Sequence, residues 1–178
     1  MHRLIAAAAV GLALSAGAAQ AAEVSVTIGP ELQKNTRAYG AREVADLADD
    51  LRKTVDKALD RAGPDAPQRV DLVLESATPN RPTYNQLTAT PGLSMFSVGV
   101  GGAAVTGTAT FADGSVKPVS YRWRETDVRW VIGYSTWTDA QRTFGQLASR
   151  LARGDVPNQG PYRPERGPAA FDSLNRFR

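Results

Sequence analysis

Two residue types that supply much of enzyme chemistry are almost absent from this chain. Its 178 residues include no cysteine and a single histidine, His2. Without a thiol or an imidazole beyond residue 2, a folded domain cannot use Cys–His or Ser–His–Asp catalysis. Zinc sites of the His/Cys type and His-ligated haem are excluded for the same reason. No disulfide can form, so the domain must be held together by core packing alone.

The first 21 residues have the three parts of a cleavable signal peptide. A short basic start precedes an unbroken run of small and apolar residues at 4–19, and Ala19-Gln20-Ala21 supplies the small-x-small cleavage pattern. A membrane anchor is the alternative, but the run is Ala-rich and shorter than the roughly 20 apolar residues of a spanning helix. We therefore expect cleavage after Ala21, a periplasmic or secreted product, and no transmembrane segment after cleavage.

Charge and the remaining reactive side chains exclude further classes. The formal net charge is +3, and loss of Arg3 with the signal peptide lowers it by one, to +2. Basic residues are scattered among acidic ones, so no nucleic acid partner is expected. None of the four lysines lies three residues after a serine, and the aspartate clusters lack the spacing of a calcium loop. We expect no cofactor and no metal.

Hydrophobic periodicity predicts one α+β domain over residues 22–154. Alternating apolar residues indicate strands, and apolar residues three or four apart indicate helices. The strands are expected at 23–28, 69–76, 103–111 and 116–124, and the helices at 41–62 and from 138 to the glycine at 154. The order β-α-β-β-β-α predicts a two-layer sandwich, in which two helices cover one face of a small, mainly antiparallel sheet of about four strands.

Local signals set the expected ends of these elements. Val44, Leu47 and Leu51 begin the apolar stripe of the first helix, and Gly63-Pro64 is expected to end it. Asp113-Gly114 predicts the turn of a hairpin. Thr138 and Gln141 have the spacing of a capping box at the start of the second helix.

Three regions lack strong periodicity. Residues 77–102 are rich in Pro, Asn, Thr and Gly and predict a long loop, with a short strand near 93–100 as an option. Residues 126–137 have room for another short strand. Residues 155–178 are rich in Pro, Gly and Arg and are expected to form a disordered tail.

Two motifs suggest chemistry only weakly. Gly99–Ala104 matches the letters G-x-G-x-x-A of a dinucleotide fingerprint, but a strand-like run follows it instead of the required helix. The glycines then serve tight turning or close backbone approach. Asp113, Glu125 and Asp127 lie near the hairpin ends and would have to pair to hydrolyse a glycan. The simpler interpretation is that Asp113 is a turn residue and that Glu125 and Asp127 are exposed, so no catalytic residue is assigned.

The candidate binding residues lie in the long loop and on the hairpin. Residues 78–90 form a polar loop, and loops of this length in small domains are often functional. The second hairpin strand places two arginines on one face, and Arg and Trp are favoured at recognition surfaces. For Trp123 and Trp137 a core role is the alternative. The binding set is Asn80, Arg81, Tyr84, Asn85, Arg122, Arg124 and Trp130.

The order of these features resembles that in families of uncharacterised proteobacterial envelope proteins. The resemblance covers most of residues 23–153 and includes the charged helix, the strand VDLVLE, the run VTGTATFADG and the closing helix. The chain departs from lipoprotein members because it has no cysteine for lipid attachment. The resemblance brings no catalytic residues and implies a non-enzymatic envelope role.

Three hypotheses for function follow. The first is an exported, non-enzymatic binding or accessory module of the cell envelope, with an envelope protein or a glycan as its partner. The second is a carboxylate-dependent glycan hydrolase. The third is a subunit of a homo-oligomeric envelope assembly joined through the exposed hairpin edge.

The first testable prediction concerns processing. Export of the complete chain should yield a product whose N-terminal sequence begins Ala22-Glu23, because Ala19 and Ala21 satisfy the small-residue requirement of the peptidase. N-terminal sequencing and the intact mass of the exported product test this. Recovery of an exported chain that retains residues 1–21 would contradict it.

Overall fold

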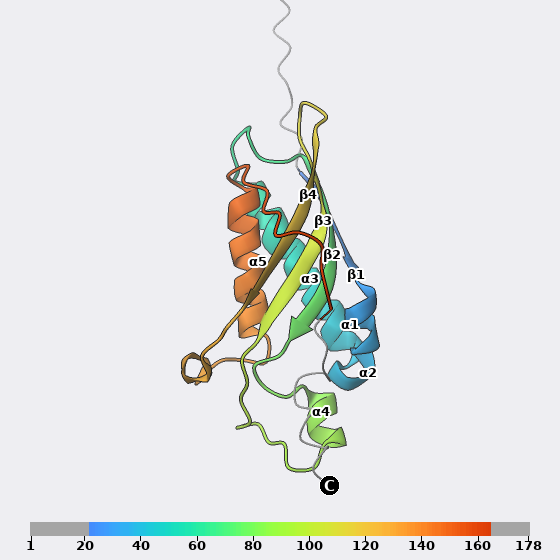
Figure 1. Ribbon diagram of the computed structural model, residues 1–178, viewed down its shortest axis with the longest axis vertical. Coiled ribbons are helices and arrows are strands. Elements are labelled where there is room, and N and C mark those ends of the chain that lie inside the picture. Colours follow the sequence, from blue (N-terminus) through green and yellow to red (C-terminus); the bar gives the residue numbers. More distant parts are fainter. Residues whose placement is uncertain (1–21, 165–178) are drawn as a thin grey trace, which may run out of the picture.

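The computed structural model describes residues 22–164 and confirms the α+β class (Figure 1). Four strands form one sheet in the order β1-β2-β3-β4. The β2–β3 and β3–β4 pairs are antiparallel, whereas β1 runs parallel to β2. The strands are β1 (Glu23–Ile28), β2 (Arg69–Thr78), β3 (Gly102–Thr110) and β4 (Val116–Arg124).

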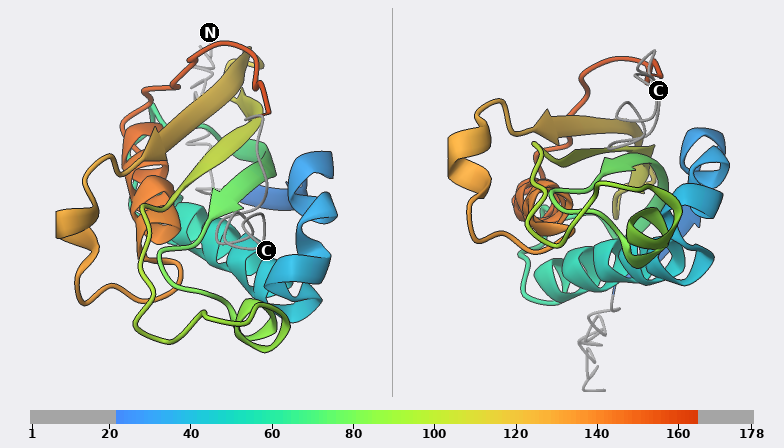
Figure 2. Two further views of the ribbon diagram at one scale, coloured as in Figure 1. Left: turned by 60° about the horizontal axis from the view of Figure 1, so that its bottom comes forward. Right: turned by 90° about the horizontal axis from the view of Figure 1, so that it is seen from below.

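Two long helices cover one face of the sheet, as the sequence predicts. They are α3 (Ala41–Leu59) and α5 (Thr138–Leu151). α3 packs on β1, α5 packs on β3 and β4, and the two helices pack against each other. Figure 2 shows both helices on the same side of the sheet. Because β1 and β2 are parallel, a crossover must connect them, and α3 forms the main part of it.

The core lies between this helical layer and the sheet. Helix α3 buries the apolar stripe read from its sequence, including Val44, Leu47, Leu51 and Val55, and α5 contributes the fully buried Phe144. On β2, Val70, Leu72 and Leu74 are buried on the same face, as the period of two requires. The periodicity therefore identified the buried face of both layers.

Several boundaries differ from the sequence predictions. α3 ends at Leu59, three residues before the predicted end, because Asp60 already caps it. The predicted capping box at Thr138 is wrong. The Thr138 Oγ1 accepts a hydrogen bond from the Ser135 N–H at 2.9 Å, and the Gln141 amide donates to Asp50 at 3.0 Å. No side chain caps the first turn of α5.

Neither of the two optional strands forms, and the long loop and the 126–137 segment each contain a short helix instead. α4 (Tyr84–Ala89) lies in the long loop and begins with a complete capping box formed by Thr83 and Gln86. Turns and irregular chain occupy 93–100, and a 3₁₀ helix, η1 (Val128–Val131), occupies the 126–137 segment. Two further short helices precede α3: α1 (Pro30–Lys34) and α2 (Thr36–Tyr39).

The chain beyond α5 returns to the sheet, which corrects the expectation of a disordered tail from residue 155. The N–H of Ser120 donates to the carbonyl of Pro157 at 2.8 Å, and Gln159 N–H donates back to the carbonyl of Ser120 at 3.0 Å. Ser120 and Asn158 form a parallel bridge. The hairpin edge proposed for assembly is therefore partly occupied by the chain itself. Residues 165–178 and the predicted signal peptide lie outside the described residues.

A matched pair of glycines tests the packing. A Cβ on Gly107 of β3, whose φ is 151°, would lie 2.0 Å from the Asp71 carbonyl oxygen, whereas a Cβ on Gly145 of α5 would have no atom within 4 Å. We expect Gly107→Ala to lower the unfolding free energy by about 3 kcal/mol or more. Gly145→Ala should raise it by about 0.5–1 kcal/mol through helix propensity. Urea unfolding measures both, and equal stability of the two variants would contradict this packing.

Candidate functional site

Two irregular segments meet at one end of the sheet, where β2 and β4 end and where β3 and α5 begin. They are residues 79–101, which include α4, and residues 125–137, which include η1. We call these two segments together the loop end; it lies at the bottom of the molecule in Figure 1. Four of the seven predicted binding residues lie in the first segment and one in the second.

A buried polar contact fixes the loop end to helix α5. Asn80 and Asp139 are both fully buried. The Asp139 N–H donates to Asn80 Oδ1 at 2.9 Å, and Asn80 Nδ2 donates to Asp139 Oδ2 at 2.5 Å. Asn80 Nδ2 also donates to the Gly99 carbonyl, and the Gly101 N–H donates to Asp139 Oδ2 at 3.1 Å. We call this the Asn80–Asp139 clasp. Because buried polar groups are normally paired, the clasp fixes residues 79–101 to the start of α5.

The glycines of the G-x-G-x-x-A run serve this clasp. A Cβ on Gly101 would lie 2.8 Å from Asn80 Oδ1 and 2.8 Å from the Thr78 carbonyl oxygen. Only glycine leaves room for the Gly101 N–H to reach Asp139. Strand β3 follows directly at Gly102, so the run lacks the helix N-terminus that a dinucleotide needs. The close-approach interpretation of these glycines fits the structure.

The Arg142 guanidinium lies near two carboxylates at the clasp, those of Asp139 and Glu125. Asp139 Oδ1 accepts no hydrogen bond among the described residues, and its nearest cation is Arg142 Nη1 at 3.8 Å. The same nitrogen lies 3.6 Å from Glu125 Oε2. The guanidinium lies over the rings of Trp123 and Tyr134, with 5.5 Å from Cζ to each ring centre. One arginine therefore links two carboxylates and two aromatic rings into a structural cluster.

Asn80 and Arg81, expected to bind a partner, instead hold the loop end together. Asn80 belongs to the clasp. Arg81 Nε donates to the Tyr134 carbonyl at 2.5 Å and its Nη1 donates to the Met95 carbonyl at 2.7 Å. Arg81 thus joins the two segments of the loop end to each other.

The other predicted residues fall on two separate surfaces. Tyr84, Asn85 and Trp130 are exposed at the loop end, and Asn85 Nδ2 donates to the Arg37 carbonyl at 3.4 Å. Arg122 and Arg124 are exposed on β4, on the face of the sheet away from the helices. The Arg122 N–H donates to Gln159 of the C-terminal segment. The structure therefore does not bring the seven residues together.

Of the three carboxylates considered for catalysis, Asp113 is separated from Glu125 and Asp127, which are neighbours. Asp113 lies in the β3–β4 turn, at the end of the hairpin opposite Glu125 (Figure 1). Hydrogen bonds from Ser115 lower the pKa of Asp113, and hydrogen bonds from Arg129 lower the pKa of Asp127. A general acid needs its pKa raised toward neutrality, so both shifts go against that role.

Sequence reasoning selected Tyr84 and Trp130 as binding residues but missed the other exposed apolar side chains at the loop end. Phe96 is 88% exposed, Ile132 78% and Trp130 67%, while the neighbouring Val131 is fully buried and anchors η1. The signal in the sequence was the presence of Met-Phe and Trp-Val-Ile in segments without helical or strand periodicity. We call these residues the apolar tips: Tyr84, Met95, Phe96, Val128, Trp130 and Ile132.

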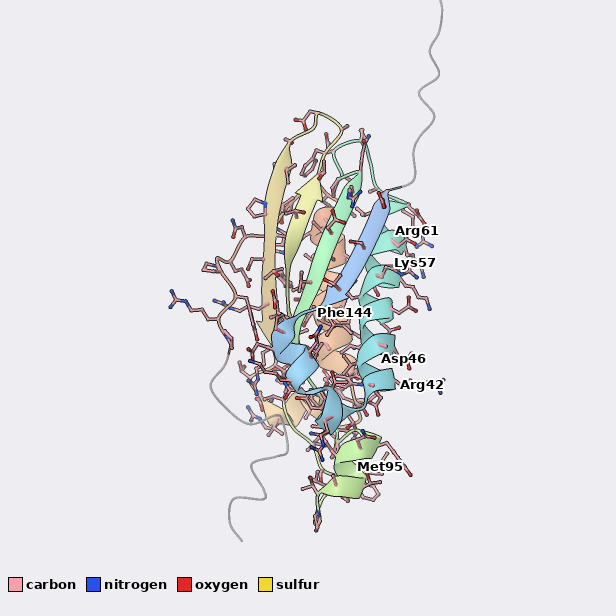
Figure 3. All side chains as sticks on the ribbon, turned by 90° about the vertical axis from the view of Figure 1, so that its right-hand side faces the viewer. Arg42, Asp46, Lys57, Arg61, Met95 and Phe144 are labelled. Atoms are coloured by element: carbon pink, nitrogen blue, oxygen red, sulfur yellow. The ribbon has the colours of Figure 1, made fainter. Side chains whose placement is uncertain are left out.

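A shallow groove of about 520 Å³ lies between α3 and α5. Small residues such as Ala58 and Ala148 line it, and Lys57, Arg61 and Arg153 supply its charged lining. Figure 3 places Lys57 and Arg61 toward the end of α3 that is remote from Met95 and the loop end. The basic groove and the apolar tips are therefore distinct surfaces.

Comparisons with known proteins add no assignment to either surface. No family model, no curated protein and no solved structure matches the chain. Among residues 22–164, no cluster of three or more His, Cys, Asp or Glu side chains is arranged to hold a metal. No helix in this part of the chain combines the length and the hydropathy needed to cross a bilayer.

The clasp predicts strong energetic coupling between Asn80 and Asp139. Asn80→Ala should lower the unfolding free energy by about 3 kcal/mol, because it leaves the Asp139 N–H and carboxylate short of partners in the interior. A double-mutant cycle with Asp139→Ala should give a coupling above about 1 kcal/mol. Asn85→Ala, at an exposed site, is the control and should change stability by less than about 0.5 kcal/mol. Additive losses would contradict the clasp.

Proposed function

We propose that this chain is an exported, non-catalytic binding module of the cell envelope that engages its partner through the apolar tips. The observation that carries the proposal is the exposure of Phe96, Trp130 and Ile132 to solvent on the same end of a small domain. Large apolar side chains that gather on a surface mark interaction sites, because their exposure to water opposes stability and solubility.

The support beneath the tips favours a binding role. Arg81 joins the segment that carries Met95 to the segment that carries Tyr134, and the clasp fixes the first of these segments to α5. Binding residues are commonly found on loops that a rigid scaffold positions, since a fixed surface loses less conformational entropy when a partner binds. The polar interior of the loop end thus holds its apolar exterior in place.

The chemistry of the chain supports a non-catalytic role. Its only histidine is His2, within the predicted signal peptide, and it has no cysteine. Glu125 and Asp127 are engaged by Arg142 and Arg129. The Glu125 Oε1 also accepts the N–H groups of residues 126 and 127. These carboxylates are committed to local structure, which favours the binding module over a glycan hydrolase.

Binding to the envelope tests the proposal. The chain purified after export should sediment with an envelope fraction of its source cells, and Phe96→Ser/Ile132→Ser should weaken that binding about tenfold or more. Both side chains are exposed, so the double variant should keep the stability of the native chain within about 0.5 kcal/mol per substitution. Circular dichroism and urea unfolding check that it remains folded.

The matched control is Val116→Ser. Val116 is also a large exposed apolar residue, but it begins β4 at the other end of the hairpin. This variant should sediment like the native chain. Undiminished binding by the Phe96/Ile132 variant, or an equal loss of binding in the Phe96/Ile132 and Val116 variants, would refute the proposed surface.

A further inference from the structure

The apolar tips project from the loop end as two separate segments. One contains Met95 and Phe96 in the turns that follow α4, and the other contains Val128, Trp130 and Ile132 in and beside η1. Figure 2 shows η1 displaced to one side of the sheet, away from α4. A partner must therefore be reached by two protruding apolar segments at once. A partner that is broad, deformable and apolar can contact both segments without having a surface shaped to fit them.

The side chains of the tips are those favoured at a bilayer surface. Trp130 and Tyr84 have an apolar ring with one polar group, the type of side chain enriched at the level of the lipid headgroups. Phe96, Met95 and Ile132 are wholly or nearly apolar and suit the upper acyl region. Aromatic and aliphatic residues of this kind bind membranes in proportion to the apolar area they bury.

The first segment of the loop end has a net positive charge, which suits anionic headgroups, whereas the charged side chains of the second segment are paired. Residues 79–101 contain Arg81 and no aspartate or glutamate. In the second segment, Glu125 and Asp127 are paired with Arg142 and Arg129. Nearby, the Glu43 carboxylate accepts hydrogen bonds from the Trp137 indole and the Tyr84 N–H.

The carboxylates of this end thus interact with groups of the chain itself. Arg37, which is exposed on α2 beside α4, adds a positive charge. Basic residues next to a bilayer are attracted to the negative surface potential of anionic lipids.

We propose that the partner of the loop end is the surface of a phospholipid bilayer that contains anionic lipids. This inference rests on the proposed binding function and names its partner. Phe96 and Ile132 enter the interface from the two segments, Trp130 lies at headgroup level, and Arg37 contacts phosphate groups. Arg81 and the clasp keep the two segments at a fixed separation, so that both enter together.

Vesicle binding provides the test. The purified chain is mixed with vesicles of phosphatidylglycerol and phosphatidylcholine in equal amounts, and binding is measured by sedimentation and by tryptophan fluorescence. The native chain should bind, and its emission should shift to the blue as Trp130 leaves water. Phe96→Ser/Ile132→Ser should weaken binding about tenfold or more. Val116→Ser should bind as the native chain does. Trp130→Phe should abolish most of the spectral shift while the chain still sediments.

Two further measurements separate this surface from the alternatives. Lys57→Glu/Arg61→Glu changes the charge of the basic groove and should leave vesicle binding within about twofold of the native value. Vesicles of phosphatidylcholine alone should bind more weakly, and high salt should reduce the difference between the two vesicle types.

Loss of binding in the Lys57/Arg61 variant with full binding in the Phe96/Ile132 variant would overturn the inference. So would the absence of binding to anionic vesicles. If the chain still sediments with the envelope fraction through Phe96 and Ile132 but binds no pure lipid, its partner is a protein or a glycan. In that case the bilayer inference fails and the proposed binding function stands. Loss of both kinds of binding refutes both.

Discussion

The contact between Asn80 and Asp139 is the constraint on which the rest of the structure depends. It joins residues that are 59 positions apart in the sequence. One follows the end of β2, and the other lies in the first turn of α5. A buried aspartate is costly unless hydrogen-bond donors surround its carboxylate. Here the Asn80 side-chain amide and the Gly101 N–H group both donate to Asp139 Oδ2, while the Asp139 N–H donates to Asn80 Oδ1. The conformation of residues 79–101 follows from satisfying that carboxylate.

The loop end contains polar side chains in its interior and apolar side chains on its exterior. Polar side chains form the interior of the loop end, where Asn80, Arg81 and Arg142 make directed contacts that define a single arrangement. Apolar side chains occupy its exterior, where Phe96 and Ile132 are largely exposed to solvent. The usual distribution of polar and apolar residues is thus inverted locally. Such an inversion is stable only because nearly all polar groups of the interior have hydrogen-bond partners. Under the proposed function, a binding partner covers the exposed apolar side chains.

Much of the fold could be predicted from the sequence, because burial imposes a period on each long element. Val70, Leu72 and Leu74 alternate on β2, and the α3 stripe returns every three or four residues. The short helices escaped prediction because four to six residues are too few to show a helical period. The capping box of α5 was predicted wrongly because Ser135 and Asp50 contact the side chains expected to form it. Five of the seven predicted binding residues lie at the loop end, but the structural roles of Asn80 and Arg81 were not predicted. Asn80 and Arg81 were chosen as polar loop residues, yet no local pattern reveals that Asp139 and Tyr134 lie opposite them. Phe96 and Ile132 were overlooked because an isolated apolar residue in a sequence is usually a core residue.

Hydrogen exchange of the exported chain, with and without envelope membranes, tests the central claim most directly, because it reports every surface at once without a substitution. Bound membranes should slow exchange in the turns at 93–98 and around η1 at 128–132, where the apolar tips lie. Exchange should stay unchanged in the β3–β4 turn and along the outer face of α3 near Lys57 and Arg61. Protection centred on the groove between α3 and α5, or no protection at the loop end, would contradict the account.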